Sequence, residues 1–210
     1  MQNTLLIFIK NPELGKAKTR IAQTVGDEKA LQVYLELLAH TRKVAKEVNA
    51  QRHLFYSSFI DEKDEWKQKD FQKFLQAKGD LGNRMSLAFQ NAFQQSEKVL
   101  IIGSDCASLT SEIVEQAFTA LDEHDFVIGP ATDGGYYLLG MRQFQPAVFR
   151  DITWSTDQVF PATIERINAL EKSYFVLPEL SDIDYWEDWL KYGWNISQVL
   201  SFSASLTLLA

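Results

Sequence analysis

Short apolar runs alternate along this chain with longer segments in which apolar residues recur every three or four positions. Residues 4–9 (TLLIFI) and 99–102 (VLII) are continuous runs, which are typical of central strands in a parallel sheet covered on both faces. Residues 27–49 show the longer period and follow Gly26, with Asp27 as the expected cap, which is typical of an amphipathic helix. The alternation predicts an α/β fold in which helices cover both faces of a mostly parallel central sheet, with residues 1–210 forming one domain.

The same patterns locate the remaining elements. Further strands are expected at residues 54–58, 71–76, 126–129, 136–140 and 174–177, and further helices at 81–95, 111–123, 156–170 and 185–194. Pro161 should kink the third of these helices or displace its start, and Asp184 is the expected cap of the last. The charged residues 61–69 predict an exposed turn of helix, while residues 195–210 alternate too weakly to assign. The residues expected to face the core from the helix at 81–95 are Met85, Leu87, Ala88, Ala92 and Phe93.

Composition excludes several classes of protein. A chain of 210 residues that is 46% hydrophobic can bury a full core. The net charge of −7, with both signs interspersed, argues against a nucleic-acid-binding surface. The single cysteine, Cys106, excludes an internal disulfide framework and favours a reducing cytoplasm. No apolar run reaches the roughly 20 residues of a membrane span, and no signal peptide is recognisable, so a soluble cytoplasmic protein is expected.

A carboxylate ends one of the buried strands. In residues 101–106 (IIGSDC) the apolar run stops at small residues and Asp105, and ligands of open α/β sheets bind outside the carboxyl ends of strands. Asp105 could hold a divalent cation, orient a ribose or cap the helix that begins near Thr110. A second acid, Asp133, precedes two glycines, and a third acidic pair lies at Asp182 and Asp184. These acids favour a site that a divalent cation shares with substrate phosphates.

The loop after the first strand is basic. Lys10, Lys16, Lys18 and Arg20 fall within eleven residues around Gly15. The glycine would let backbone amides approach an anion and the cations could neutralise a pyrophosphate, although a solvated basic loop is the alternative. It is not a P-loop, because Lys10 stands where that motif needs its first glycine.

Two glycine-containing segments could also contact a ligand. Residues 79–84 (GDLGNR) open a helix and suit a phosphate, ribose or base contact, unless Asp80 is only a helix cap. The glycines after Asp133 could instead serve a tight turn. No Cys/His cluster suits zinc, and the three histidines give no support to a Ser-His-Asp apparatus or a histidine base. We expect Cys106 to be a packed apolar residue, and Trp186, Trp189 and Trp194 to lie in the core or at a homodimer contact.

Five motifs together resemble a known family. In order along the chain they are Lys10-x-Pro12…Gly15-Lys16-x-Lys18-Thr19-Arg20, Gly79-Asp80-Leu81-Gly82-x-Arg84-Met85, Ile102-Gly103-Ser104-Asp105-Cys106, Gly129-Pro130-Ala131-x-Asp133-Gly134-Gly135-Tyr136-Tyr137-Leu138-x-Gly140 and Trp154-Ser155-Thr156. They resemble a bacterial family of glycosyltransferase-like proteins with the GT-A, nucleotide-diphospho-sugar transferase fold. Some members are named arsenosugar-biosynthesis glycosyltransferases. More distantly, the chain is similar to 2-phospholactate and molybdenum-cofactor guanylyltransferases.

The resemblance implies a role for each motif. Asp105 would present Mg²⁺ or Mn²⁺ to a nucleotide diphosphate, with Asp182 or Asp184 as a second metal contact. The nucleotide would be bound by Lys10, Gly15, Lys16, Lys18, Arg20, Gly79, Asp80, Gly82 and Arg84. The donor or acceptor pocket would be lined by Asp133, Gly134, Gly135, Tyr136, Trp154, Ser155 and Thr156.

These expectations lead to three candidate functions. The first is metal-dependent glycosyl transfer from a nucleotide sugar to an unidentified small acceptor, with Asp133 and Lys16 as catalytic residues. The second is nucleotidyl transfer, which joins an NTP to a phosphorylated or carboxylated small molecule and releases pyrophosphate. The third is a non-catalytic nucleotide-binding protein on the same fold. Retention of every candidate ligand argues against the third, because a degenerate site would be expected to lose acids or lysines first.

Overall fold

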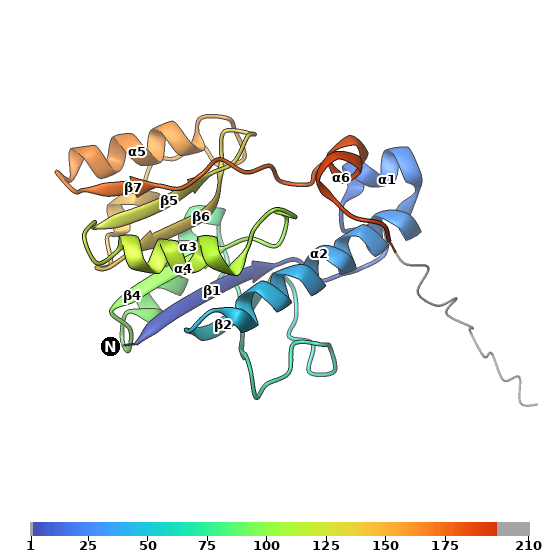
Figure 1. The fold of residues 1–210 in the computed structure, drawn as a ribbon, viewed down its shortest axis with the longest axis horizontal. Helices are drawn as coiled ribbons and strands as arrows, with labels where there is room; N and C mark the ends of the chain where they lie inside the picture. The colour runs from blue at the N-terminus through green and yellow to red at the C-terminus, as the bar shows by residue number, and fades with distance from the viewer. Residues whose placement is uncertain (1, 197–210) are drawn as a thin grey trace, which may run out of the picture.

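The computed structural model describes residues 2–196, and seven strands of this part form one sheet (Figure 1). The strands are β1 (Asn3–Ile9), β2 (Gln51–Tyr56), β3 (Gln72–Leu75), β4 (Lys98–Ile102), β5 (Phe126–Pro130), β6 (Tyr136–Met141) and β7 (Tyr174–Val176). Their spatial order is β3-β2-β1-β4-β6-β5-β7. Only β6 runs against its neighbours, so the sheet is mostly parallel as predicted.

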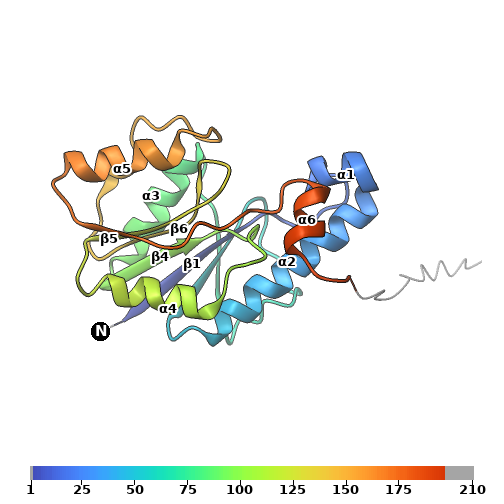
Figure 2. The ribbon, with the colours of Figure 1, turned by 45° about the horizontal axis from the view of Figure 1, so that its top comes forward.

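Helices cover both faces of this sheet. Figure 2 shows α3 (Leu81–Ala92) and α5 (Val159–Ala169) on one side, and α2 (Asp27–Glu47) and α4 (Ser111–Ala120) on the other. Strand β1 is buried on both faces: Leu5 and Ile7 pack towards α2 and α4, while Leu6 packs towards α3. This two-sided burial explains why the strand is a continuous apolar run. No helix among residues 2–196 is long and apolar enough to cross a bilayer.

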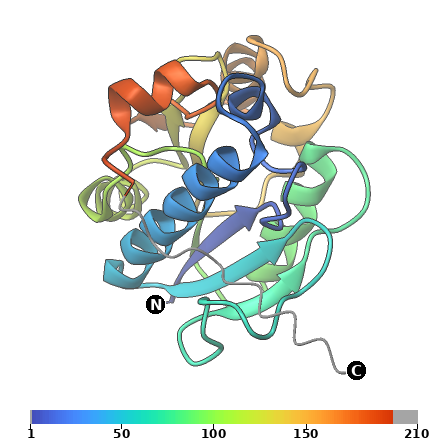
Figure 3. The same ribbon diagram turned by 90° about the vertical axis from the view of Figure 1, so that its right-hand side faces the viewer.

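Two short helices lie beyond the carboxyl end of β1. Helix α1 (Thr19–Val25) and helix α6 (Trp186–Tyr192) pack together, as Figure 3 shows for the dark blue and red ribbons. Ile21, Ile183 and Trp189 form a small buried cluster there with the first turns of α2. Trp189 is therefore a core residue, as expected. The segments before α1 and α6 come from opposite ends of the chain and are brought to the same edge of the sheet.

Several expected features differ from the structure. Residues 61–69 form bends and turns instead of helix, because Asp61 and Asp64 accept hydrogen bonds from the local amides of Lys63 and Trp66. Pro161 is the third residue of α5, whose start is displaced to Val159. Helix α1 and a 3₁₀ turn, η1 (Pro146–Phe149), were not predicted.

Smaller corrections concern caps and one core position. Gly26, not Asp27, is the N-cap of α2, and Tyr185, not Asp184, is the N-cap of α6. Leu87 is exposed, and Phe89 is buried among the core residues instead. Of the unassigned tail, residues 197–210 lie outside the described part of the chain.

Candidate functional site

The acidic residues singled out in the sequence gather at one rim of the sheet. Asp105 follows the carboxyl end of β4, and Asp133 lies in the loop between β5 and β6. The segment after β7 crosses this rim: the amide of Ile183 donates to the carbonyl of Asp105 at 2.8 Å, and Asp182 faces Cys106 in an isolated antiparallel bridge. A second bridge joins Leu180 to Ala131. Asp182 and Asp184 are thereby fixed beside Asp105, as the sequence predicted.

Asp105 does not cap the helix that follows it. The side chain of Thr110 takes that role, because its hydroxyl accepts from the amide of Ile113 at 3.4 Å. The Asp105 carboxylate is partly exposed, with 43% of the side chain accessible to solvent. Cys106, directly after it, is buried, and burial together with the Asp182 charge raises the pKa of its thiol to about 12. A thiol of this kind is a packing residue and not a nucleophile.

Lys18 provides the positive charge at the centre of the acidic rim. Its Nζ lies 2.5 Å from Asp105 Oδ1 and 3.9 Å from Asp184 Oδ1, and it donates to the carbonyl of Ile183 at 2.6 Å. Only 7% of the Lys18 side chain is exposed. Its backbone is left-handed, with φ at 50°. Lys18 is thus the one cation of that loop that contacts Asp105 in the described structure.

Asp182 is a buried carboxyl with other acidic residues around it. Burial raises the pKa of its carboxyl to about 7, and the negative charges of Asp105 and Asp133 push it in the same direction. Lys18 opposes the shift without cancelling it. A cation bound beside Asp182 would favour its ionised form.

The donor chemistry fits a hard divalent cation, since carboxylate oxygens are the ligands that Mg²⁺ and Mn²⁺ prefer. However, no group of three or more acidic, histidine or cysteine side chains within residues 2–196 is arranged to hold a metal. The ammonium of Lys18 lies against one oxygen of the Asp105 carboxylate. A metal held here would depend on Asp105 and Asp182 and on oxygens from a ligand.

The other cations of the basic loop lie at the periphery. Arg20 pairs with Asp184 at 2.8 Å and lies over the ring of Tyr185. Lys16 is 70% exposed and pairs with Glu13 at 2.7 Å, so it does not face Asp105 in this structure. The backbone amide of Lys10 donates to the hydroxyl of Tyr34 at 2.9 Å.

Tyr34 is a site residue that sequence reasoning missed. Its hydroxyl contacts both the carbonyl of Lys10 and the hydroxyl of Ser104, so it ties the loop after β1 to the loop after β4. The helical period of α2 marked Tyr34 only as a core position. Its phenolic oxygen, in a row of leucine and alanine residues, was the available signal, because a buried hydroxyl needs partners.

The segment at residues 79–84 joins the site through Trp154. Asp80 caps α3 by accepting from the amide of Asn83 at 2.8 Å, as expected from the sequence. Gly82 is buried against the indole of Trp154, where a Cβ would come within 2.5 Å of Cζ2. Arg84 is held by the carbonyl of Gly79 and by Gln76, whose side-chain oxygen accepts at 3.2 Å. Two motifs far apart in sequence therefore form one wall.

The loop at residues 131–135 is shaped by its glycines. Gly134 has φ at 86° and rests on the backbone of Asp157, and its carbonyl accepts from the amide of Phe160 at 2.8 Å. The amide of Gly135 donates to Asp133 Oδ1 at 2.8 Å, which leaves the exposed carboxylate with a free oxygen. This geometry holds Asp133 on the solvent side of the rim.

The remaining predicted pocket residues divide in their roles. The hydroxyl of Tyr136 points towards Met85 Sδ at 3.8 Å, and burial raises its pKa, so it belongs to the packing beneath the rim. Thr156 donates to the carbonyl of Thr153 at 2.7 Å and closes a turn in which Ser155 has φ at 63°. Ser155 itself is exposed. Thr156 is exposed as well, so both side chains of this turn can be reached from solvent.

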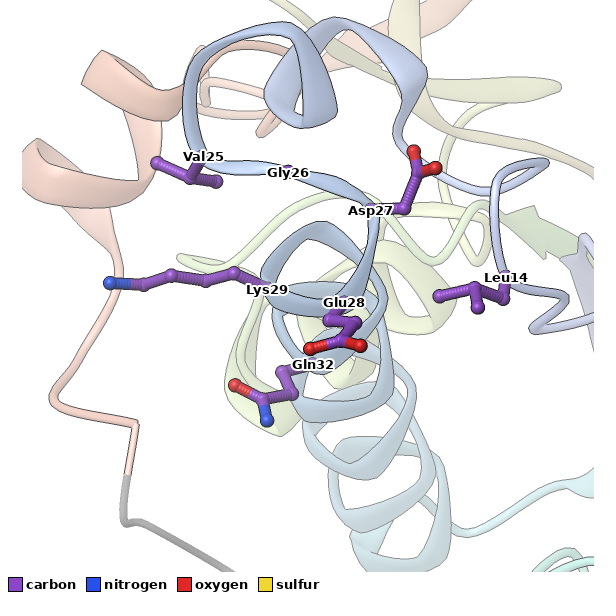
Figure 4. A pocket seen from close by; sticks show the side chains of 7 residues that line it. All are labelled: Leu14, Val25, Gly26, Asp27, Glu28, Lys29 and Gln32. Atoms are coloured by element: carbon purple, nitrogen blue, oxygen red, sulfur yellow. The ribbon is translucent and has the colours of Figure 1, made fainter. Parts of the chain in front are cut away.

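One open hollow of the surface is formed by Leu14 of the basic loop, Val25 and the first turn of α2 (Figure 4). It contains exposed charged side chains such as Glu28 and Lys29 and shares no residue with the acidic rim. We place the candidate site at the rim, because the predicted motifs converge there and not at this hollow.

Comparison with known proteins supports the motifs and the fold. The profile of a family described as "Uncharacterized protein conserved in bacteria (DUF2064)" matches residues 38–156, more than half of the chain, including Asp105, Asp133 and Trp154. A "putative nucleotide-diphospho-sugar transferase" from Desulfovibrio desulfuricans G20 is 33% identical, with a TM-score of 0.82 over 88% of this chain and 84% of its own. No curated protein matches the chain.

More distant structures share the fold. The inositol-1-phosphate CTP transferase of T. maritima is 14% identical, with a TM-score of 0.60 over 89% of this chain and 91% of its own. Rv0371C of Mycobacterium tuberculosis H37Rv, whose structure is a complex with manganese, is 10% identical, with a TM-score of 0.52 over 91% of this chain and 98% of its own. The predicted nucleotide-diphospho-sugar transferase fold is thereby confirmed.

Proposed function

The chain belongs to the bacterial DUF2064 family, and from this premise we propose that it is a metal-dependent transferase that uses a nucleotide-sugar donor and a small acceptor. The observation that carries the proposal is the convergence of Asp105, Asp182 and Lys18 at one rim of the sheet. Carboxylates and an ammonium placed together suit the metal-bound diphosphate of such a donor. The name of the 33% identical relative supports the same class of donor.

Asp105 and Asp182 are the residues that would hold Mg²⁺ or Mn²⁺. When bound, such a cation neutralises negative charge on the departing diphosphate. Lys18 and Arg20 extend the positive charge across the phosphates, and the backbone around Gly15 can approach them closely. The wall formed by Gly82 and Trp154 would lie beside the nucleoside or the donor sugar.

Asp133 is our candidate for orienting or deprotonating the acceptor hydroxyl. One of its oxygens accepts from Gly135, while the other is available on the exposed side of the rim. Lys16, the second catalytic candidate, would have to leave Glu13 to reach a bound diphosphate. Because 70% of the Lys16 side chain is exposed, the side chain has room to make this movement.

Nucleotidyl transfer is the second candidate. It is favoured by the fold shared with the T. maritima CTP transferase and by the lysine-rich first loop, which suits a triphosphate. The same rim would hold the NTP, and a phosphorylated or carboxylated molecule would displace pyrophosphate. The leaving group separates the two reactions: nucleoside diphosphate for glycosyl transfer and pyrophosphate for nucleotidyl transfer.

A thermal-shift panel tests the proposal. Nucleotide sugars, nucleoside diphosphates and triphosphates are each added with and without Mn²⁺, because a ligand that binds only native protein raises its apparent stability. We expect a Mn²⁺-dependent shift, larger for one nucleotide sugar than for its diphosphate. A preference for a triphosphate would instead support nucleotidyl transfer, and no shift with any nucleotide would contradict both.

Asp105→Asn is the matching variant and should abolish the Mn²⁺-dependent part of the shift. Asp122→Asn is its control, since Asp122 also pairs with a lysine, Lys98, at 2.5 Å. That pair lies at the opposite end of β4, away from the rim. An unchanged shift in Asp105→Asn would remove Asp105 from the metal role.

A further inference from the structure

The ammonium of Lys18 lies so close to Asp105 that it would repel a cation bound to the same carboxylate. The distance from Nζ to Asp105 Oδ1 is 2.5 Å, so a metal on either oxygen of the same carboxylate would lie beside a second positive charge. Only a small part of the Lys18 side chain is exposed, and water screens the repulsion less than it would at the surface. With Lys18 in this position, the ion pair disfavours metal binding to the free protein.

Lys18 is held in this place by more than one contact. The carbonyl of Ile183 accepts from Nζ at 2.6 Å, and Asp184 Oδ1 lies 3.9 Å from Nζ. An ammonium has three hydrogens, and two are used by Asp105 and Ile183. To bind a phosphate through more than one hydrogen bond, Lys18 must give up one of these two contacts.

These contacts couple two binding events, and the coupling rests on the proposed function. We propose that Lys18 competes with the divalent cation for Asp105, and that the phosphates of the nucleotide relieve this competition by accepting the ammonium. Metal alone then binds weakly, and metal and nucleotide bind together. Lys18 therefore sets the order in which the site is filled, in addition to contacting the ligand.

No other described cation can take over this role. Arg20 is engaged by Asp184 and by the ring of Tyr185, and Lys16 points to Glu13. When Lys18 turns to a phosphate, Asp105 is left without a positive partner and becomes a stronger metal ligand.

The test is a Mn²⁺ titration of the nucleotide-free protein, followed by electron paramagnetic resonance of the free ion. Lys18→Met and Lys18→Gln remove the charge and keep a long side chain, and the two variants guard against a folding failure of either. Both should bind Mn²⁺ about tenfold more tightly than the wild type, within the usual range of coupling between sites. Lys18→Arg keeps the charge and should bind Mn²⁺ as weakly as the wild type. The control, Lys98→Met, removes a lysine that pairs with a carboxylate, Asp122, at the opposite end of β4 and should leave Mn²⁺ binding unchanged.

Two results would overturn the inference. One is equal affinity of the wild type and both neutral variants for Mn²⁺, and the other is a loss of Mn²⁺ binding in the neutral variants. Failure of the proposed function gives a different pattern: no nucleotide stabilises the wild type with Mn²⁺, although the neutral variants still bind the ion more tightly. The two ideas can therefore fail separately.

Discussion

The indole of Trp154 lies against Gly82, so closely that a methyl group on Gly82 would come within 2.5 Å of its Cζ2 and 2.6 Å of its Nε1. Gly82 is in the first turn of α3, and Trp154 is in the loop before α5. The glycine therefore accommodates an aromatic ring that joins two segments of the rim. Helix propensity alone would favour alanine at this position, so the close approach explains the glycine.

Gly82→Ala should destabilise the protein by about 1–3 kcal/mol, because the added methyl displaces the indole. Chemical denaturation of the single variants and of the double variant with Trp154→Ala measures the effect. In the Trp154→Ala background, Gly82→Ala should be neutral or stabilising by up to about 1 kcal/mol, since only the gain in helix propensity remains. Additive effects of the two changes would show that the contact carries no energy.

Gly134 and its neighbour Gly135 should respond differently to alanine. Gly134 has φ at 86°, and a Cβ would come within 2.3 Å of the backbone oxygen of Asp157. Gly134→Ala should therefore cost more than about 1 kcal/mol in the free energy of unfolding and distort the loop that carries Asp133.

Gly135→Ala is the matched control for that prediction. Its Cβ would come no closer than 3.1 Å, to the side chain of Asp133, which is able to move. We expect a change well below that of Gly134→Ala, measured by the same denaturation. Equal costs at the two positions would mean that the backbone contact with Asp157 is not the cause.

Asp125 should make the attachment of β7 to β5 sensitive to acid. Burial tends to raise the pKa of its carboxyl, but hydrogen bonds from Ser173 and the charges of Lys172 and Arg142 outweigh it and hold the pKa below the ordinary 3.8. A carboxyl whose pKa is lower in the folded than in the unfolded state stabilises the folded protein at pH values above the unfolded-state pKa. This stabilisation is lost as the pH falls through the folded-state pKa. The difference in the free energy of unfolding between wild type and Asp125→Asn, which we call the stability gap, should therefore be largest near neutral pH and decrease below about pH 4.

Denaturant unfolding at several pH values measures this gap. Asp151→Asn serves as the control, because Asp151 is 87% exposed and lies 3.9 Å from Arg166. Such surface pairs contribute little, so we expect no pH-dependent gap for this variant. A gap for Asp125→Asn that stayed constant down to about pH 2 would contradict the prediction.

The sequence predicted the sheet well because its strands are buried in a way that leaves a clear pattern. Strands β1 and β4 are continuous apolar runs, and the loop between β5 and β6 is too short for a crossover helix, which agrees with their antiparallel pairing. The position of Asp105 at the rim followed from the same patterns. Helix α1 escaped detection because it has seven residues and buries only Ile21. A helix of this length is too short for a helical repeat of apolar residues to be recognised in the sequence.

The roles of individual cations could not be predicted in the same way. Lys16 and Lys18 are two positions apart in a loop, and the sequence treated them alike. In the structure Lys18 pairs with Asp105, while Lys16 pairs with Glu13. The carbonyl of Ile183, which accepts a hydrogen bond from Lys18, is 165 residues away in sequence. Only the tertiary arrangement decides which lysine enters the rim.

A catalytic role of Asp133 can be tested separately from its hydrogen bond with the amide of Gly135. Asp133 Oδ1 accepts from the amide of Gly135, and an asparagine oxygen can accept the same bond. If Asp133 deprotonates the acceptor, Asp133→Asn should keep wild-type stability and lose about 100- to 10,000-fold in turnover. Asp133→Ala should lose the same activity and also about 1 kcal/mol in the free energy of unfolding, because the Gly135 amide loses its partner.

The measurement for Asp133 combines denaturation with the release of nucleoside diphosphate from the donor that the thermal-shift panel identifies. Asp157→Asn, in the neighbouring exposed loop, is the control for removing a negative charge near the rim and should leave turnover within about twofold. Wild-type turnover in Asp133→Asn, together with reduced stability in Asp133→Ala, would limit Asp133 to holding the loop. The base would then have to be sought among Asp182 and Asp184, which lie on the same rim.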